Sequence, residues 1–282
     1  MPGAAARRGP HSIAQFEHQN LWHRVTVADD GGEVADALRL LVASAEHELE
    51  PSRTQRYDVA AATGGWALSE EGDAWGFEAT AAGAADAIAA RSRARALELA
   101  ALKGWVRIHG ALVDLGGKRI LLAGPPGAGK TALALGLALR GGELQGDESV
   151  LLRKGEALAV PAPLRLGEGR VAAPALATAR AHLRADGFSL LDPARDLGLS
   201  WRLRAAPVDH VVVLDPRPGR PVCVPSTPAE TLSQLAARLA DTALPKAVAV
   251  RALVGALERA RCHLLAAADG GAMEVAIAAL SC

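Results

Sequence analysis

One short segment constrains the fold of this chain more than any other feature. Gly124–Thr131 reads GPPGAGKT and matches the pattern G-x-x-x-x-G-K-[ST]. The apolar segment Arg119–Ala123 precedes it, and the helix-forming segment TALALGLALR follows it. A strand, this loop and a helix in that order are what the pattern needs in order to bind phosphate. We therefore predict a phosphate loop within an α/β fold.

The chemistry of such a loop assigns roles to its residues. Backbone N–H groups converge on phosphate oxygens, and the helix N-terminus adds its partial positive charge. Lys130 is expected to bridge the β- and γ-phosphates, and Thr131 to hold Mg²⁺ through its hydroxyl. The expected nucleotide-binding residues are Gly124, Pro125, Pro126, Gly127, Ala128, Gly129, Lys130 and Thr131. The alternative, a chance glycine-rich turn, does not explain the flanking strand and helix.

A β-hairpin is predicted immediately before the loop. Val106–Asp114 is mostly apolar, and Gly116 and Gly117 separate it from the strand that leads into the loop. A Gly-Gly connection is typical of a tight hairpin turn. With the turn centred there, the expected pairs are Leu115 with Lys118, Val113 with Ile120, and His109 with Gly124. This register brings His109 to the mouth of the loop and favours a role near the phosphates, although a single strand histidine is more often structural.

Carboxylates that suit magnesium occur in two places. Asp147 and Glu148 lie in or at the end of the strand expected after the phosphate-loop helix, which returns them near the loop. There one of them would bind Mg²⁺ and the other would abstract the proton of an acceptor hydroxyl. We favour Asp147 as the base. Asp215 ends the apolar run VVVLD, the usual position in a generic phosphate-loop ATPase. The residues alone leave both sites open, and a solvated acidic turn is a further alternative for the pair.

Composition limits the class of protein. Half of the 282 residues are hydrophobic, and 31 Lys and Arg balance 31 Asp and Glu, which favours neither a nucleic-acid partner nor a membrane surface. Cys223, Cys262 and Cys282 lack the spacing of metal ligands and suit a reducing compartment. We find no apolar run of about 18 residues and no signal-peptide pattern. We therefore expect a cytoplasmic protein with neither kind of partner.

The remaining pattern predicts two parts. We expect an N-terminal α+β subdomain with a joining helix over residues 1–104 and a phosphate-loop domain over 105–282. The elements expected in the first part are a loose arm over 1–24, a helix at Val34–Glu48, strands at Tyr57–Ala62, Trp66–Leu68 and Trp75–Glu78, and a helix at Thr80–Lys103. Those in the second part are extended segments at Leu144–Leu152, Val208–Leu214 and Cys262–Ala267, and helices at Thr227–Leu239, Pro245–Ala260 and Gly271–Leu280.

Residues 155–207 are rich in Pro, Gly and Arg and suit a mobile substrate loop. Within them, Arg202 and Arg204 alternate in the segment SWRLR. Alternating arginines usually form one solvated face of a strand, and less often a clamp on a transferring phosphoryl group.

The order of these features resembles the catalytic core of HPr kinase/phosphorylase. It resembles still more closely the HPr-kinase-like kinases found beside peptide-tailoring enzymes, including lasso-peptide kinases. The matching features are His109-Gly110, the hairpin, the phosphate loop, a helix ending in Arg140-Gly141, and the acidic pair. The resemblance is clear over about His109–Leu152. It implies a phosphate-loop kinase core of the type shared with phosphoenolpyruvate carboxykinase, an acidic pair that binds metal and activates a serine hydroxyl, and a histidine near the transferred phosphate.

Three departures from that family concern the acceptor. Glu148 stands where the family usually has Asp, and Pro126 stands where HPr kinases carry Ser. The glycine-rich stretch by which HPr kinases engage their protein substrate is not found. These departures argue against HPr as the acceptor and against the reverse, phosphorylase reaction.

We therefore expect a kinase that uses ATP and Mg²⁺ to phosphorylate a hydroxyl, with a serine of a peptide or protein as the favoured acceptor. The expected catalytic residues are His109, Lys130, Asp147 and Glu148, and the expected metal ligands are Thr131, Asp147 and Glu148. Free serine or a sugar is an alternative acceptor. A nucleotide-dependent ATPase or switch with Asp215 as ligand is an alternative of another class. The resemblance also implies a homo-oligomer, although the sequence identifies no interface.

Overall fold

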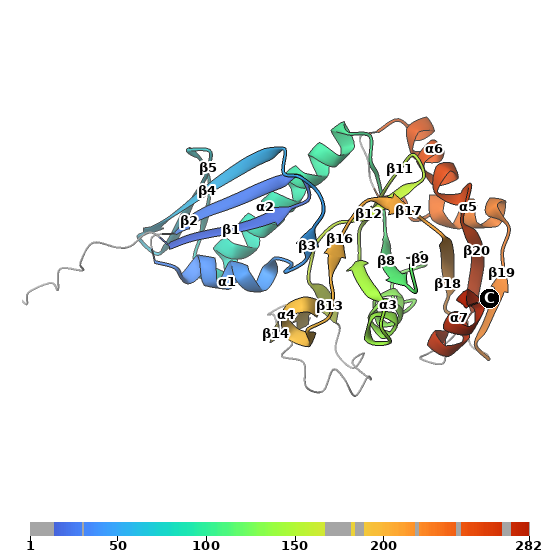
Figure 1. Cartoon of the computed structure of the whole chain (residues 1–282). Coiled ribbons are helices and arrows are strands. Elements are labelled where there is room, and N and C mark those ends of the chain that lie inside the picture. Colours follow the sequence, from blue (N-terminus) through green and yellow to red (C-terminus); the bar gives the residue numbers. More distant parts are fainter. Residues whose placement is uncertain are drawn as a thin grey trace, which may run out of the picture. The chain divides into compact units, whose positions relative to one another are not determined.

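The computed structural model describes residues 14–29, 31–166, 182–183, 189–217, 220–240, 244–266 and 272–281. The chain divides into two compact units, one made of residues 1–42 and 51–96 and the other of 43–50 and 97–282. Each unit combines helices with strands, so the protein is mixed α/β (Figure 1). The domain boundary between residues 104 and 105 stays a prediction.

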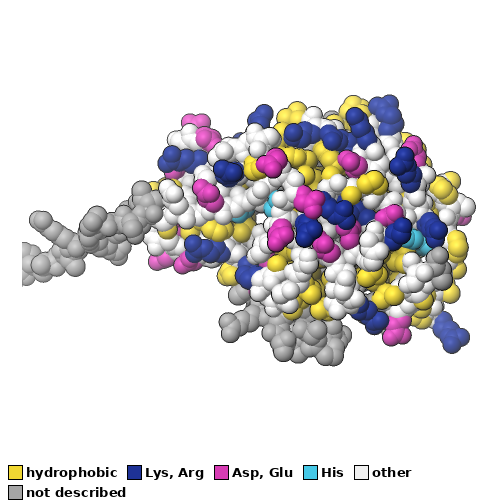
Figure 2. Space-filling view, viewed as in Figure 1, with side chains coloured by type: hydrophobic (Ala, Val, Ile, Leu, Met, Phe, Trp, Pro, Cys, Tyr) yellow, Lys and Arg dark blue, Asp and Glu magenta, His cyan; other side chains and the backbone are white. Residues whose placement is uncertain are grey.

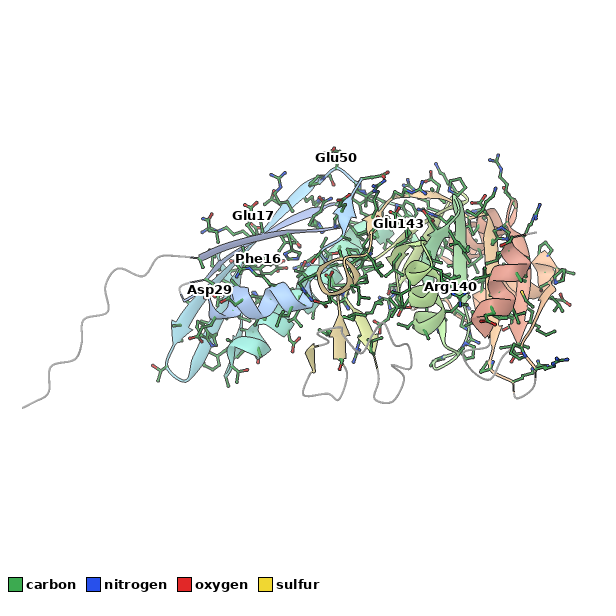
Figure 3. All side chains as sticks on the ribbon, turned by 60° about the horizontal axis from the view of Figure 1, so that its bottom comes forward. Phe16, Glu17, Asp29, Glu50, Arg140 and Glu143 are labelled. Carbon is green, nitrogen blue, oxygen red and sulfur yellow. The ribbon has the colours of Figure 1, made fainter. Side chains whose placement is uncertain are left out.

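The first unit contains a five-stranded sheet. Its strands, in sheet order, are β1 (Ala14–Asn20), β2 (His23–Asp29), β4 (Arg53–Ala62), β5 (Gly65–Glu70) and β6 (Asp73–Glu78). Its helices are α1 (Glu33–Leu41) and most of α2 (Ala81–Leu102). Val25 and Val27 of β2 share one core with residues of both helices. The Asp29 carboxylate, labelled in Figure 3, accepts hydrogen bonds from the N–H groups of Val34 and Ala35 at 2.9 and 3.0 Å, which satisfies the N-terminus of α1.

Two expectations for this part of the chain are wrong. The loose arm predicted over residues 1–24 is a hairpin from Ala14 onward, because β1 pairs antiparallel with the whole of β2. Residues 1–13 lie outside the described residues. The helix expected at Val34–Glu48 ends at Leu41, because Val42 is extended and the Ser44 N–H donates to Asp192 Oδ2 at 2.7 Å. The other predicted elements are confirmed, as β4, β5, β6 and α2.

The second unit is built on a six-stranded mixed sheet. Its strands, in sheet order, are β10 (Glu143–Gly146), β8 (Gly110–Leu115), β9 (Lys118–Ala123), β18 (His210–Asp215), β20 (Arg261–Ala266) and β19 (Val222–Pro225). The central strands β9, β18 and β20 run parallel, and the outer pairings are antiparallel. Central strands of this kind are covered on both faces, which explains the unbroken apolar run on β18.

Helices cover both faces of this sheet. The helices are α3 (Lys130–Leu139), α5 (Pro228–Ala236), α6 (Lys246–Leu257) and α7 (Ala272–Leu280). Leu121 and Val211 share a core with α5 and α6, whereas their neighbours Ile120 and Val212 share another with α3 and α7. This alternation follows from the period of two along a strand.

The predicted helices of this unit and the strands expected at Val208–Leu214 and Cys262–Ala267 are confirmed, with bounds that differ by a few residues. The expected helix from Thr227 begins with the predicted capping box, in which the Thr227 hydroxyl accepts from the Glu230 N–H at 3.2 Å and the Glu230 carboxylate accepts from the Thr227 N–H at 3.0 Å. The last expected strand and helix correspond to β20 and α7, whereas Ala267 and Gly271 lie outside the described residues.

The second unit also contains a smaller, four-stranded sheet. Its strands, in sheet order, are β17 (Ala206–Pro207), β12 (Glu156–Ala159), β11 (Val150–Arg153) and β7 (Val106–Ile108). Further short elements are β3 (Glu46–His47), which pairs with β16 (Arg202–Leu203), the strands β13 (Leu164–Leu166), β15 (Ser189–Leu191) and β14 (His182–Leu183), and α4 (Pro193–Leu197). Much of the predicted mobile segment is therefore regular structure, while its residues 167–181 and 184–188 lie outside the described residues.

At two places the chain passes between the larger sheet and the smaller one. The sequence did not predict these crossings. The single strand expected at Val106–Asp114 is interrupted at His109, because β7 pairs with β11 while β8 pairs with β9 and β10. The extended segment Leu144–Leu152 is likewise interrupted at Asp147 and Glu148, between β10 and β11. Both interruptions fall on residues singled out as catalytic.

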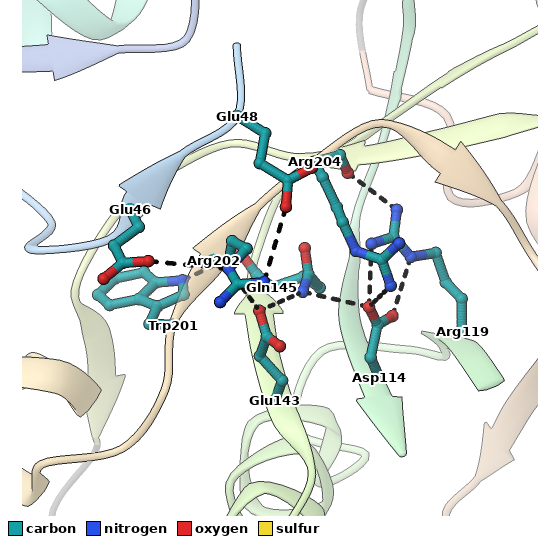
Figure 4. A network of polar contacts seen from close by, with 9 residues as sticks. All are labelled: Glu46, Glu48, Asp114, Arg119, Glu143, Gln145, Trp201, Arg202 and Arg204. Carbon is teal, nitrogen blue, oxygen red and sulfur yellow. Dashed lines mark hydrogen bonds and ion pairs between the residues drawn. The ribbon is translucent and has the colours of Figure 1, made fainter. Parts of the chain in front are cut away.

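A buried ion pair joins the two strands of the predicted hairpin (Figure 4). The Asp114 carboxylate of β8 accepts from Arg119 Nε of β9 at 2.9 Å and from Arg119 Nη2 at 3.1 Å. Both side chains are almost fully buried, and Arg119 Nη1 also donates to the carbonyls of Ala157 and Arg204. Arg204 Nη2 donates to Asp114 Oδ2 at 2.5 Å. The negative charge of Asp114 therefore faces the positive charges of two arginines.

Arg202 is surrounded by carboxylates. Its guanidinium lies within 4 Å of Glu46, Glu48 and Glu143 (Figure 4). The two arginines considered as a phosphoryl clamp are therefore engaged by acidic residues of the same unit.

The surface is mixed in charge where Figure 2 shows it, with basic and acidic side chains interspersed. Among the helices that the structure describes, none combines the length and the apolar character needed to cross a bilayer.

Replacing Asp114 tests the importance of the buried pair. Asp114→Ala leaves Arg119 buried without its counter-charge, and we expect the free energy of unfolding to fall by about 3–5 kcal/mol. Urea unfolding at pH 7 measures this change. Glu48→Ala is the matched control, because that side chain is 51% exposed and 3.8 Å from Arg202, and its removal should cost less than about 1 kcal/mol. Similar losses in the two variants would contradict the prediction.

Candidate functional site

The segment predicted as a phosphate loop connects β9 to α3, so both expected neighbours are present. Gly124 has φ of 153°, and a Cβ atom there would lie 2.8 Å from the Leu214 carbonyl oxygen. Gly127 and Gly129 have φ of 78° and 91°, in the region that favours glycine. The backbone path of the loop therefore depends on its glycines.

Lys130 begins α3 and is folded back beneath the loop. Its side chain is 5% exposed, and Nζ donates to the carbonyls of Gly124 and Pro125, each at 3.0 Å. Burial lowers the pKa of Lys130, and the negative charge of Asp147 opposes that change. A cation is thus held within the loop by neutral carbonyls, where an anionic ligand would bind.

Asp147 lies against the end of the loop. Thr131 Oγ1 donates to Asp147 Oδ2 at 2.6 Å. The position follows from topology: β10 runs antiparallel to β8, which returns the chain from α3 to the level of the loop. Burial raises the pKa of the Asp147 carboxyl, while the hydrogen bond from Thr131 opposes that change. The structure therefore brings together Lys130, Thr131 and Asp147.

His109 contacts the second member of the acidic pair through its backbone. His109 Nδ1 lies 2.9 Å from the Glu148 carbonyl oxygen, and Glu148 has φ of 65°, an uncommon conformation for a residue with a side chain. Because a carbonyl oxygen only accepts, Nδ1 carries the hydrogen of this bond. Backbone strain of this kind often occurs at functional residues.

The expected register of the hairpin is confirmed except at its end. Leu115 pairs with Lys118 and Val113 with Ile120, but the pairing stops at Gly110 and Ala123. The predicted pair of His109 with Gly124 is wrong. The His109 N–H donates instead to the Arg238 carbonyl at 2.9 Å, since the chain turns there into the smaller sheet.

Asp215, the alternative magnesium carboxylate, ends β18 beside the strand that leads into the loop. Its carboxylate pairs with Arg217 at 2.7 Å. The hydroxyl of Thr131 is bonded to Asp147. The geometry thus places the carboxylate of Asp147 against Thr131 at the end of the loop, whereas that of Asp215 pairs with Arg217.

Arg238 is a residue of the site that sequence reasoning missed. It follows α5, its carbonyl accepts from His109, and its charge contributes to the lowered pKa of Lys130 after burial. Nothing in its sequence context distinguishes it, because the contact joins residues far apart in the chain.

Comparison with known proteins identifies one relative by sequence. No family model matches the chain. It is 31% identical over 110 residues to HPr kinase/phosphorylase of Caldanaerobacter subterraneus subsp. tengcongensis. The match covers 39% of this chain and 32% of that protein, so the chain spans about a third of the relative's length. The chain is therefore distantly homologous to HPr kinase/phosphorylase.

Among solved structures, the Hpr(Ser) kinase/phosphatase from Coxiella burnetii aligns with 62% of this chain and 93% of its own. The TM-score is 0.32 and the sequence identity 12%.

Replacing Gly124 tests the geometry of the loop. In Gly124→Ala, the new Cβ would meet the Leu214 carbonyl, and the backbone would have to hold a φ that side chains rarely adopt. We expect a loss of about 2 kcal/mol or more in the free energy of unfolding and weaker binding of ATP. Urea unfolding and titration calorimetry measure the two effects. Gly76→Ala is the control, because its Cβ would meet nothing closer than 3.7 Å, and it should change stability by less than about 1 kcal/mol.

Proposed function

From its distant homology to HPr kinase/phosphorylase, we propose that this protein is an ATP-dependent kinase that transfers the γ-phosphoryl group to a hydroxyl. We propose a serine of a peptide or protein as the acceptor. The observation that carries the proposal is the contact of Thr131 with Asp147 at 2.6 Å, directly beside the buried Lys130. A cation, a hydroxyl and a carboxylate at the end of a glycine loop are the groups that phosphoryl transfer requires.

We propose that the second unit is a phosphate-loop kinase core of the HPr kinase/phosphoenolpyruvate carboxykinase type. Three observations support this: the order β9, loop and α3, the parallel strands β18 and β20 beside β9, and the hairpin before the loop. A generic ATPase core does not require the hairpin, whereas the family resemblance includes it.

The residues present fit a magnesium nucleotide. Lys130 lacks an anionic partner within hydrogen-bonding distance among the described residues, and its neutral partners are loop carbonyls. Thr131 and the acidic pair offer oxygen atoms only, which Mg²⁺ prefers, and this ion takes few protein ligands and several waters. No cluster of three His, Cys, Asp or Glu side chains that suits a metal forms among the described residues, which is compatible with that mode of binding. When bound, Mg²⁺ would neutralise charge on the phosphates.

Each of these residues would have its own role in the reaction. Lys130 would neutralise charge on the β- and γ-phosphates, and Thr131 with Glu148 would hold the metal. Asp147 would accept the proton of the acceptor hydroxyl as its oxygen attacks the γ-phosphorus and the bond to the bridging oxygen breaks, releasing ADP. We favour Asp147 as base because burial raises the pKa of its carboxyl, which makes the carboxylate a stronger proton acceptor. His109 would orient the pair through Glu148.

The acceptor is proposed to differ from HPr. Pro126 removes a hydroxyl from the loop, and Glu148 lengthens the second acidic side chain. A homo-oligomeric state, a cytoplasmic location and the lack of nucleic-acid or membrane partners stay predictions.

A transfer assay tests the proposed activity. We expect the protein, with ATP and Mg²⁺, to phosphorylate serine-containing peptides, measured by ADP release and by mass spectrometry of each acceptor. Free serine and sugars belong in the same panel, because a phosphorylated small molecule would replace the peptide acceptor in our proposal. ADP release that is independent of every acceptor, without a phosphorylated product, would indicate an ATPase or switch.

A pair of matched variants separates the kinase from that second candidate. Asp147→Asn keeps the size of the side chain but removes the base, so we expect transfer to fall by about 1,000-fold or more while ATP still binds. Asp215→Asn should leave transfer within about threefold, since its carboxylate pairs with Arg217. The reverse ranking in magnesium-dependent turnover would move the metal site to Asp215.

A further inference from the structure

Strand β10 contains a β-bulge close to its end. Leu144 pairs with Val113 of β8. The next pair joins Gly146 to Leu112, so Gln145 between them has no partner on that strand. A bulge inserts one extra residue into a strand, and because side chains alternate between the two faces of a sheet, every residue after the bulge changes face.

This change of face decides where Asp147 points. Leu144 belongs to the core that includes α3, whereas Leu112, which pairs with Gly146, belongs to the core of the opposite face. The alternation that resumes after the bulge therefore directs Asp147 toward α3, where the Thr131 hydroxyl donates to its carboxylate at 2.6 Å. Without the extra residue, the same alternation would direct Asp147 toward α5 and α6.

The bulge residue is held at its backbone and at its side chain (Figure 4). Gln145 is fully buried, and its carbonyl oxygen accepts a hydrogen bond from Nε1 of Trp201 at 3.1 Å. Its side-chain Nε2 donates to Asp114 Oδ2 at 3.3 Å. A buried carbonyl needs a donor, so the indole N–H of Trp201 stabilises the bulged path of the chain.

Trp201 is itself fixed in place. Its side chain is 2% exposed and packs in the core that includes α3. Its backbone forms a parallel bridge with Leu144, and its carbonyl accepts from the Glu46 N–H at 2.9 Å. The indole N–H therefore has a defined position beside β10, at a residue that precedes Asp147 by two positions.

We propose that Trp201 is a positioning residue for phosphoryl transfer: its indole N–H fixes the bulge at Gln145, and the bulge aims the Asp147 carboxylate. This inference rests on the proposed kinase function. Trp201 contacts neither the nucleotide nor the acceptor in this role, because it acts through the backbone of β10. Displacing a catalytic group by about 1 Å can slow a reaction about 100-fold, so a loosened bulge should slow transfer without weakening nucleotide binding.

Replacing the indole tests this role. Trp201→Phe keeps a buried aromatic ring but removes the donor, and we expect kcat for transfer to fall about tenfold or more while KM for ATP stays within about twofold. Backbone hydrogen exchange over residues 145–149, followed by mass spectrometry, should quicken about tenfold. Trp105→Phe is the matched control, because Trp105 is 3% exposed and its ring contacts Arg153 instead. Its kcat, KM and exchange should stay within about twofold of the wild type.

The outcomes separate this inference from the proposed function. Wild-type kcat or unchanged exchange in Trp201→Phe, or an equal fall of kcat in Trp105→Phe, would overturn the role of Trp201. A wild-type protein that phosphorylates no acceptor would refute the proposed function, but hydrogen exchange would still decide whether Trp201 fixes the bulge. If Trp201→Phe does not fold, benzothienylalanine at position 201 keeps both rings and replaces the N–H by sulfur. Its kcat should also fall about tenfold, and a wild-type kcat there would overturn the inference.

Discussion

The hydrogen bond from His109 to the Glu148 carbonyl joins the two places where the chain leaves the larger sheet. β8 and β10 are neighbours in that sheet, and their continuations β7 and β11 are neighbours in the smaller one. Because the chain passes between the sheets at the same level in both places, His109, Asp147 and Glu148 lie outside the regular strand pairing. The backbone at this crossing therefore holds Asp147 and Glu148 at the end of the loop.

The same hairpin is secured at its other end by charge. Asp114 and Arg119 pair across β8 and β9 near the turn, and Arg204 adds a third member. The Asp114 carboxylate accepts hydrogen bonds from both arginines, whereas Lys130 at the loop end donates to backbone carbonyls. The hairpin therefore has directly paired ions near its turn, and at its loop end a lysine whose charge is opposed by Asp147 without a hydrogen bond between the two side chains.

Local signals in the sequence predicted much of this arrangement. The glycine loop, the Gly-Gly turn and the capping box of Thr227 depend on neighbouring residues, and the structure has each of them where expected. The approach of Asp147 to Thr131 followed from element lengths. The crossings at His109 and Asp147 depend on which strands pair with which, and Arg238 reaches the site by a contact between distant segments. No periodicity of the chain encodes those pairings, which explains why they were missed.

The short strand β3 also has a consequence for how the protein is made. Residues 43–50 belong to the second unit although the chain then returns to the first, and β3 pairs in parallel with β16, more than half the chain length later. During synthesis, Glu46 and His47 are available long before Leu203 exists to pair with them. Closing so long a loop is entropically costly and slow. The pairing of β3 therefore forms only after more than 200 residues have been translated, and a fragment that began after residue 50 would lack β3 altogether.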